Sequence, residues 1–324
     1  MGNRVSPPTV ALVAVMVMWS SSFVVIRSIG EDVSPAAMAE GRLLAASVVL
    51  LGCWVWRYRG RLLATIPRGM TLALLVGYGA MWFAIYTVLV NAAEQHLDAG
   101  TTALLVNIAP IVVAVLAGIF LREGFPPLLM VGIAVSFAGA AIIAFSGPGR
   151  HDRIGVALAI AAALLYGVSV VAQKLVLAKT DPLTATALGC AVGTLVLAPY
   201  APTLISELAS APVSSTAGVV YLGLAPTAAG FLLWAYALAH TPAGLTISAS
   251  YAVPALSIVG SWIFLSEGPG IAGLVGGVLC LAGVAIARIN YVRPEKPSEK
   301  PPRRTRDRLV TSRQPVGSSG LLRF

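Results

Sequence analysis

Apolar segments of about 20 residues recur along nearly the whole chain, and this pattern constrains the fold more than any other feature. A helix needs about 20 mostly apolar residues to cross a hydrocarbon layer roughly 30 Å thick. Charged residues make up only 11% of the 324 residues, whereas an ordinary soluble domain is about 25% charged. Because such a chain cannot build a water-exposed surface, we predict an all-α integral membrane protein.

The chain divides at charged or Pro- and Gly-rich interruptions into ten expected transmembrane helices. They cover residues 9–29, 34–56, 70–92, 99–120, 127–146, 154–176, 183–205, 216–239, 243–265 and 269–290. Most connections are short, which makes sequential helices antiparallel neighbours, and only 57–69 and 206–215 are longer. From Arg293 the composition changes to Pro, Lys, Arg, Glu and Ser, so we expect residues 293–324 to form a disordered basic tail.

The positive charges lie mostly on one side of these expected spans. Cytoplasmic flanks retain Lys and Arg, and a cytoplasmic N-terminus places 18 of these residues on the cytoplasmic side against three on the other, with Arg42 inside a span. The net charge of +9 is then a topology signal, and no nucleic-acid partner is expected. We predict a multi-pass protein of the cytoplasmic membrane with both termini cytoplasmic.

The two halves of the chain resemble each other at a fixed offset. Residues 99–143 align without a gap on 243–287, with 16 of 45 positions identical. Pro110 and Pro254 match, as do Glu-Gly pairs that shared apolar composition would not produce. We therefore predict two five-helix repeats, 9–146 and 154–288. Because five is odd, the second repeat must enter the membrane from the opposite side, and such inverted repeats are typical of secondary transporters.

Short motifs occur in the same order in the two repeats. The first has Trp19-Ser20-Ser21-Ser22-Phe23 ending in Arg27, then Ser34-Pro35 with Arg42, then Ala109-Pro110 with Phe120-Leu121-x-Glu123. The second has Val253-Pro254 with Phe264-Leu265-x-Glu267. This set resembles the EamA-like family of the drug/metabolite transporter superfamily over about residues 9–288. The resemblance implies a ten-helix inner-membrane carrier, often an exporter, for amino acids, metabolites, nucleobase-like compounds or drugs.

Two charged residues fall inside the second expected span, Glu40 and Arg42. A charge at the bilayer centre costs roughly 2.5–3.5 kcal/mol on insertion scales, so it usually faces a cavity or a partner. We expect both to contact solute, and snorkelling to the membrane surface is the alternative. Glu40 is also the candidate for coupling to protons, because a carboxyl group can bind and release one. Glu40 is not part of the family pattern.

Polar and aromatic residues inside other spans complete the predicted solute-binding set. Trp19 and Tyr166 occupy equivalent positions of the two repeats, and Asn107 and Tyr251 each precede a matched proline by three residues. The full candidate set is Trp19, Glu40, Arg42, Tyr86, Asn91, Asn107, Tyr166, Trp234 and Tyr251. Plain packing of the aromatic members is the alternative.

Pro110 and Pro254 lie mid-span, where a proline removes a backbone hydrogen bond and bends the helix. We predict that they act as hinges, with a static kink as the alternative. Arg27 and Lys174 are expected to be cations at helix ends. Glycines of the tenth span, such as Gly276 and Gly283, favour close packing within the chain, with a homodimer as the alternative.

We predict a secondary transporter, and specifically an exporter, that moves a small metabolite, amino acid or drug-like solute by rocking of the two halves. A primary pump would need a phosphate-binding GxxxxGK[ST] loop, and the sequence contains none. We expect no catalytic residues, no metal and no cofactor, because the spans contain no Asp, HExxH or GxSG. An intramembrane hydrolase, a channel or scramblase, and a non-transporting sensor are the alternatives.

Overall fold

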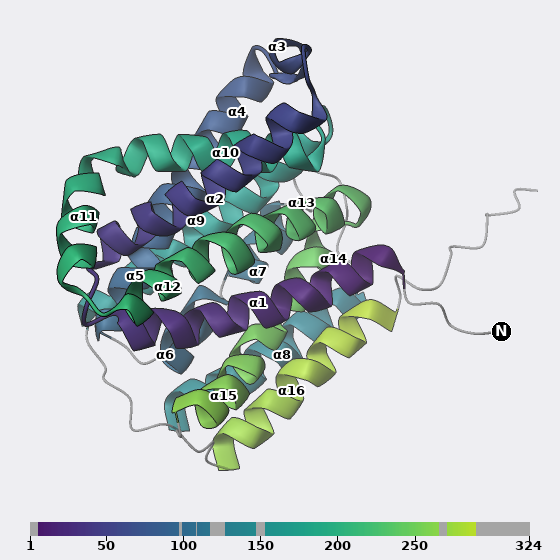
Figure 1. The fold of residues 1–324 in the computed structure, drawn as a ribbon. Coiled ribbons are helices and arrows are strands. Elements are labelled where there is room, and N and C mark those ends of the chain that lie inside the picture. The colour runs from purple at the N-terminus through teal and green to yellow at the C-terminus, as the bar shows by residue number, and fades with distance from the viewer. Residues whose placement is uncertain are drawn as a thin grey trace, which may run out of the picture. The chain divides into compact units, whose positions relative to one another are not determined.

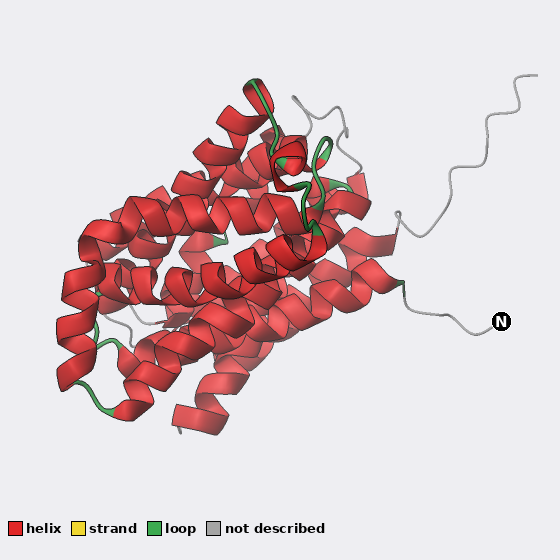
Figure 2. Ribbon diagram, turned by 45° about the horizontal axis from the view of Figure 1, so that its top comes forward, coloured by secondary structure: helices red, strands yellow, loops and turns green. Residues whose placement is uncertain are grey.

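The computed structural model of the protein describes residues 6–96, 99–107, 109–116, 127–146, 153–265 and 271–289. Within these ranges the chain is helical, joined by short turns, and contains no strand (Figure 2). All the described residues belong to one compact unit. The predicted basic tail, like Glu123 and Glu267, lies outside the described residues.

The first half of the chain forms long helices, several of them divided into segments (Figure 1). They are α1 (Pro7–Ile29), α2 (Pro35–Arg57), the short α3 (Leu62–Thr65), then α4 (Met70–Tyr78), η1 (Gly79–Tyr86) and α5 (Thr87–His96), then α6 (Ala99–Val106), α7 (Ala109–Leu116) and α8 (Pro127–Ser146). The segments α4, η1 and α5 make one continuous helix, in which η1 has π-helical hydrogen bonding.

The second half has the same order of segments. They are α9 (Arg153–Leu177), α10 (Pro182–Leu197), η3 (Ala198–Tyr200), α11 (Ala201–Ser210), α12 (Val213–Leu222), η4 (Gly223–Ala229), α13 (Gly230–His240), α14 (Ala243–Ser248), η5 (Ala249–Tyr251), α15 (Ala252–Leu265) and α16 (Ile271–Ile289). The prediction of a connection over 206–215 was wrong for its first half, because α11 continues the helical path to Ser210.

Seven helical stretches of the described chain are long and apolar enough to cross a membrane. They are Pro7–Ile29, Pro35–Arg57, Met70–His96, Ile154–Leu177, Pro182–Ser210, Val213–His240 and Ala243–Phe264. Of the other three expected spans, the fourth is divided into α6 and α7, and the fifth and tenth contain the shorter apolar helices Pro127–Gly139 and Leu274–Gly283. The number of ten spans stays a prediction.

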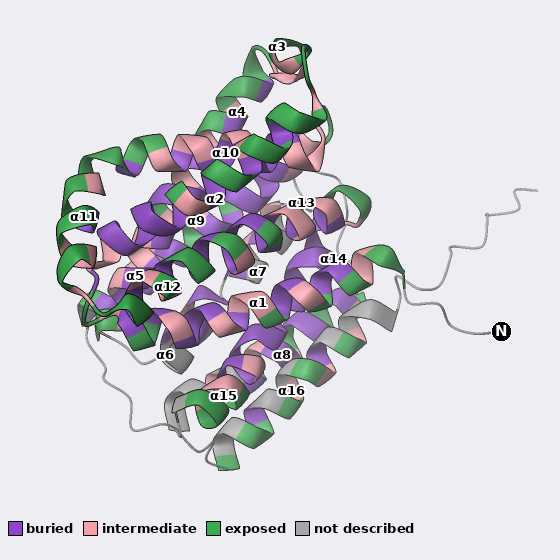
Figure 3. Cartoon of the chain, viewed as in Figure 1, coloured by how far each residue is buried: buried purple, intermediate pink, exposed green. Residues whose placement is uncertain are grey.

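The helix faces that point away from the other helices are rich in exposed apolar side chains (Figure 3). On α1, Val10, Val13 and Val17 follow one another at about one helical turn, and each is 55–57% exposed. Soluble monomers rarely expose contiguous apolar surface of this kind. With the seven apolar helices, this surface identifies a multi-pass membrane protein.

Helices α2 and α10 begin in the same way, with a capping residue followed by proline. Asp181 precedes Pro182, and its carboxylate accepts a hydrogen bond from the Thr184 N–H at 3.0 Å. In α2, Ser34 precedes Pro35, but here the hydrogen-bond acceptor is a side chain of another helix. The Glu207 carboxylate of α11 accepts from the Ser34 N–H at 2.9 Å and from the Ser34 hydroxyl at 3.1 Å. Proline is favourable at this position because its missing N–H has no helical partner there.

Two helices become π-helical at the same point of the repeat. The segments η1 and η4 begin at Gly79 and Gly223, which are separated by the offset that aligns 99–143 with 243–287. A Cβ on Gly79 would lie 2.9 Å from the carbonyl oxygen of Gly189 in α10, and one on Gly223 would lie 2.6 Å from that of Arg42 in α2. Each π-helical segment thus packs closely against the second long helix of the other half.

Helices α8 and α16 also pack closely, and they lie side by side in Figure 1. A Cβ on Gly283 would lie 2.5 Å from the carbonyl oxygen of Gly132 and 2.1 Å from the Ser136 hydroxyl. Glycine is therefore needed at this crossing. This part of the predicted Gly-rich face packs within the chain.

Candidate functional site

A cavity lies between helices from both halves of the chain. Its volume for water-sized molecules is about 60 Å³, within about 660 Å³ of space between atoms that includes the opening to the surroundings. Its walls are Trp19, Ser22, Phe23, Ile26, Arg42, Trp82, Tyr86, Thr87, Val90, Asn91, Ala103, Val106, Asn107, Tyr166, Phe231, Ser250 and Val253. Because the last third of α1 and the first third of α2 contribute, the cavity lies toward the side on which α1 connects to α2.

Six of the nine predicted solute-contacting residues line this cavity, and three do not. The six are Trp19, Arg42, Tyr86, Asn91, Asn107 and Tyr166. Glu40 is only 2% exposed, and Trp234 and Tyr251 are completely buried outside the cavity wall. The structure thus brings together side chains from five long helices, while their contact with solute stays a prediction.

Arg42 is the cation of the cavity wall, and it connects α2 to the π-helical segment η4. Its Nε donates a hydrogen bond to the Thr227 hydroxyl oxygen at 3.0 Å. The Thr227 hydroxyl in turn donates to the carbonyl oxygen of Leu222 at 2.7 Å. A guanidinium has five N–H donors, so this bond orients the group and leaves other donors for water or an anionic solute.

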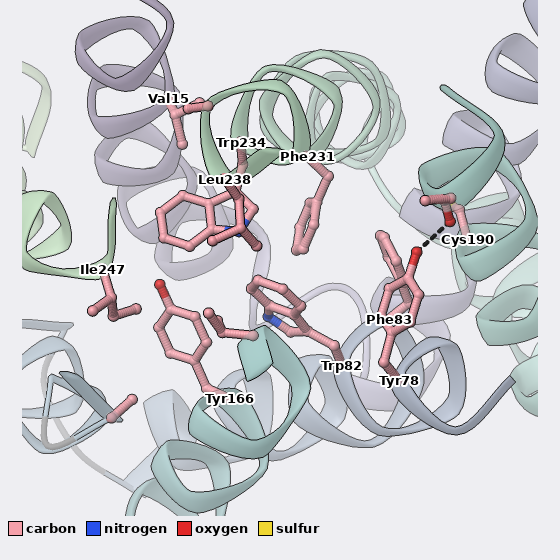
Figure 4. Packing of buried hydrophobic residues seen from close by; sticks show 14 of the residues in the cluster. Val15, Tyr78, Trp82, Phe83, Tyr166, Cys190, Phe231, Trp234, Leu238 and Ile247 are labelled. Carbon is pink, nitrogen blue, oxygen red and sulfur yellow. Dashed lines mark hydrogen bonds between the residues drawn. The ribbon is translucent and has the colours of Figure 1, made fainter. Parts of the chain in front are cut away.

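Trp19 bonds to the same π-helical segment, since its Nε1–H donates to the carbonyl oxygen of Pro226 at 3.2 Å. Its ring centroid is 4.9 Å from that of Trp234 and 5.5 Å from that of Phe231. Trp82 continues the group, with centroids 5.1 Å from Tyr166 and 5.0 Å from Phe231 (Figure 4). These five residues form the aromatic cluster, and all of them except Trp234 line the cavity.

Both predicted hinge prolines lie beside interruptions of their helices. The helix α6 ends at Val106 and α7 begins at Ala109, which places Pro110 in the first turn of α7. In the ninth expected span the 3₁₀ segment η5 precedes α15, which places Pro254 in its first turn. A proline removes no helical hydrogen bond in a first turn. Hinge motion at these sites stays a prediction.

Asn107 lies at the end of α6 and contacts the equivalent interruption of the second half. Its Nδ2 donates to the Ala103 carbonyl oxygen at 2.6 Å, and its Oδ1 accepts from the Ser250 hydroxyl at 3.3 Å. Ser250 lies in η5. The two interruptions therefore meet at the cavity wall through a polar contact.

Sequence reasoning missed Glu94, a second carboxyl group close to the cavity. It follows Asn91 by three residues on α5, and both of its carboxyl oxygens are buried without a hydrogen-bond partner. The expected span ended at residue 92, whereas the helix extends to His96, so extending the span by one turn would have included this carboxyl group.

The C-terminal end of α9 is hydrogen-bonded to α13. Lys174, near the C-terminus of α9, donates from Nζ to the carbonyl oxygens of Leu238 and Thr241. These carbonyls belong to the C-terminal end of α13, where unpaired carbonyl groups favour a cation. This observation gives the predicted helix-end cation a specific contact between α9 and α13.

Comparison with known proteins gives a consistent result. The sequence model of the EamA-like transporter family matches residues 8–145 and again residues 153–289. A protein of Streptantibioticus cattleyicolor named "Probable terminal-alkyne amino-acid exporter" is 35% identical over 301 residues, which is 93% of this chain and all of that protein. The uncharacterized transporter YdfC of Bacillus subtilis is 29% identical over 280 residues, 86% of this chain and 90% of that one. One solved crystal structure shares the fold with a TM-score of 0.70 and 19% identity, covering 89% of this chain and 99% of that chain.

Proposed function

Because the chain belongs to the EamA-like transporter family, we propose that it is a secondary carrier that exports a small amino acid with an apolar side chain. The relatives carry the names of transporters, and one is named as an amino-acid exporter. The observation that carries the proposal is the cavity, in which the guanidinium of Arg42 and the aromatic cluster other than Trp234 occupy walls of one space.

The two kinds of wall suit the two parts of such a solute. Arginine binds a carboxylate through charge-assisted, often bidentate hydrogen bonds, and Thr227 holds the Arg42 guanidinium by only one of its donors. An apolar side chain can pack against the aromatic rings of Trp82 and Phe231, both of which line the cavity. The cavity thus favours a small molecule with one anionic end and one apolar end.

The proposed mechanism is alternating access by two inverted five-helix repeats, 9–146 and 154–288, in the cytoplasmic membrane. It is supported by the two family matches and by the equivalent π-helical segments η1 and η4. Both termini would lie in the cytoplasm. Cysteine labels that place the 57–68 connection and the C-terminal tail on different faces of the membrane would refute this topology.

A proton gradient is the proposed energy source, and Glu40 and Glu94 are the candidate proton-binding groups. Glu40 has one buried carboxyl oxygen without a hydrogen-bond partner, and Glu94 has two. Glu94→Gln removes the titrating group with little change in shape, so export driven by a pH gradient should fall while exchange down a solute gradient persists. If Glu94→Gln and Glu40→Gln both keep full pH-driven export, neither group couples it.

The proposal is tested with purified protein reconstituted in proteoliposomes. The vesicles are loaded with radiolabelled L-norvaline or L-propargylglycine, and the efflux of the label is measured. We expect the efflux to saturate with concentration. The unlabelled free amino acid should inhibit the efflux, whereas norvaline amide, which lacks the carboxylate, should not. Arg42→Gln should lower efflux at least about tenfold, because a hydrogen bond to a charged group contributes about 1.5–3 kcal/mol. Arg57→Gln, at the exposed end of the same helix, is the matched control and should transport normally.

Several outcomes would overturn the proposal. They are no movement of either amino acid under any gradient, equal competition by the amide, or normal transport by the Arg42→Gln variant. Flux that rises linearly with concentration would indicate a channel, and chemical conversion of the solute would indicate an enzyme.

A further inference from the structure

Several residues that line the cavity in the first half have equivalents in the second half that are completely buried. Ser169 and Gln173 of α9 correspond to Ser22 and Ile26 of α1 at the offset that aligns Tyr166 with Trp19. Ser22 and Ile26 line the cavity, whereas Ser169 and Gln173 are both 0% exposed. The equivalent helix faces are therefore in different states, one lining a cavity and one packed shut.

One position on the third long helix of each half shows the same difference. Trp234 of α13 corresponds to Val90 of α5 at the offset that aligns η4 with η1. Val90 lines the cavity, and Trp234 is completely buried. We call Ser169, Gln173 and Trp234 the closed face.

The closed face carries polar groups that make no hydrogen bond. The Ser169 hydroxyl, both amide atoms of Gln173 and the Trp234 Nε1 are buried without a partner. The Tyr78 hydroxyl donates to the carbonyl oxygen of Ala185 (Figure 4). Buried polar groups without partners destabilise a fold and call for an explanation.

The closed face is continuous with the cavity. Tyr166, Ser169 and Gln173 are spaced by three and four residues along α9, so they share one face of that helix. Tyr166 lines the cavity, and the face continues toward the C-terminal end of α9, where Lys174 bonds to the end of α13. It therefore leads from the cavity toward the side opposite the α1–α2 connection.

We propose that the closed face lines the solute path when the transporter opens to that opposite side, and that its polar groups then bind the charged end of the amino acid and its water. This inference rests on the proposed alternating access. The Gln173 amide offers both a donor and an acceptor, which suits the ammonium and carboxylate groups of an amino acid. Opening requires α9 and α13 to separate, so Lys174 must release the Leu238 and Thr241 carbonyls.

The first test measures stability and transport in the same variants. Gln173→Leu removes two unpartnered polar atoms, so it should raise the melting temperature by roughly 2 °C or more. It should nevertheless lower norvaline efflux at least about tenfold, because the path loses its polar contacts. Ser169→Ala should change both quantities in the same directions but by less.

Thr186→Val is the matched control. Thr186 is also completely buried with an unpartnered hydroxyl, but its equivalent in the first half, Ala39, does not line the cavity. We expect the control to gain stability and keep full transport. A Gln173→Leu variant that transports normally would overturn the inference and leave the proposed function intact, whereas a wild-type protein that moves no norvaline would refute the proposed function itself.

The second test measures access by labelling with a membrane-impermeant thiol reagent, in a transport-active variant with all three native cysteines replaced by serine. Ile26→Cys should react from the side of the α1–α2 connection, and Gln173→Cys should react only from the other side and only when a norvaline gradient drives turnover. If Gln173→Cys stays unreactive from that side during measured turnover, the closed face does not line the path.

Discussion

The substitution Gly223→Ala adds one methyl group where η4 crosses α2, and we expect it to weaken both the fold and transport. The added Cβ would lie 2.6 Å from the Arg42 carbonyl oxygen and 2.6 Å from the Ala45 Cβ. Ordinary contact begins at 3.4 Å, so the helices would have to separate by about 0.8 Å. Because one of the obstructing atoms belongs to the backbone, a change of rotamer cannot relieve the contact.

The size of the effect follows from two opposing terms. Overpacking of this kind costs about 1–3 kcal/mol, while alanine gains about 1 kcal/mol over glycine in a helix. Gly52→Ala is the matched control, because Gly52 lies in α2 and a Cβ there meets nothing within 4 Å. The difference between the two variants isolates the packing cost of about 1–3 kcal/mol, which lowers the melting temperature by roughly 2–4 °C per kcal/mol.

Transport should fall in Gly223→Ala for a separate reason. A helix separation of about 0.8 Å would stretch the hydrogen bond between Arg42 Nε and Thr227, now 3.0 Å, beyond the 3.2 Å usual for such bonds. Losing the hydrogen bond that orients this charged donor costs about 1.5–3 kcal/mol of interaction free energy. This cost corresponds to an interaction with solute that is weaker by at least about tenfold. Thermal unfolding in detergent and norvaline efflux from proteoliposomes measure the two effects. If Gly223→Ala has the same melting temperature as Gly52→Ala and transports like the wild type, the close crossing does not position Arg42.

Three further substitutions test individual contacts. Thr227→Val keeps the side-chain shape but leaves the Arg42 Nε without its acceptor, so we expect a loss of about 1.5–3 kcal/mol in unfolding free energy. An unchanged melting temperature would show that water replaces the hydroxyl. Glu207→Ala removes the acceptor at the start of α2, so stability should fall by about 1 kcal/mol while transport per folded molecule is unchanged; lost transport would contradict a purely structural role. Lys174→Met removes both hydrogen bonds to the end of α13, and Gln173→Cys in that background should label faster from the opposite side, whereas equal rates would exclude Lys174 from holding that side closed.

Sequence analysis selected six of the residues that line the cavity, because these six are polar or aromatic residues inside apolar spans. Trp19, Arg42 and Asn107 could be selected in this way, since a polar or charged group inside a span is costly unless it meets a cavity or partner. Trp234 and Tyr251 were selected on the same grounds but lie in the second half outside the cavity wall. The sequence pattern cannot distinguish an open face from a closed one, because equivalent helices of the two halves carry similar residues.

The contacts that position the site could not be predicted in this way. Thr227 and Pro226 have no distinctive sequence pattern, and they become partners of Arg42 and Trp19 only because η4 is π-helical and packs on α1 and α2. Glu94 was missed because span ends are set by hydropathy, whereas the helix continues past the apolar segment. The second half of α11 was missed because Glu207 and its neighbours resemble a polar connection.

The amino-acid sequence by itself determined that this chain enters a membrane as apolar helices and that it carries a family motif set twice, because the length and composition of a helix are local properties. The tertiary structure alone decided which residues meet across the two halves and which face of the repeat is closed. The physical reason is that these features depend on contacts between segments far apart in the sequence, such as Arg42 with Thr227 and Lys174 with the end of α13.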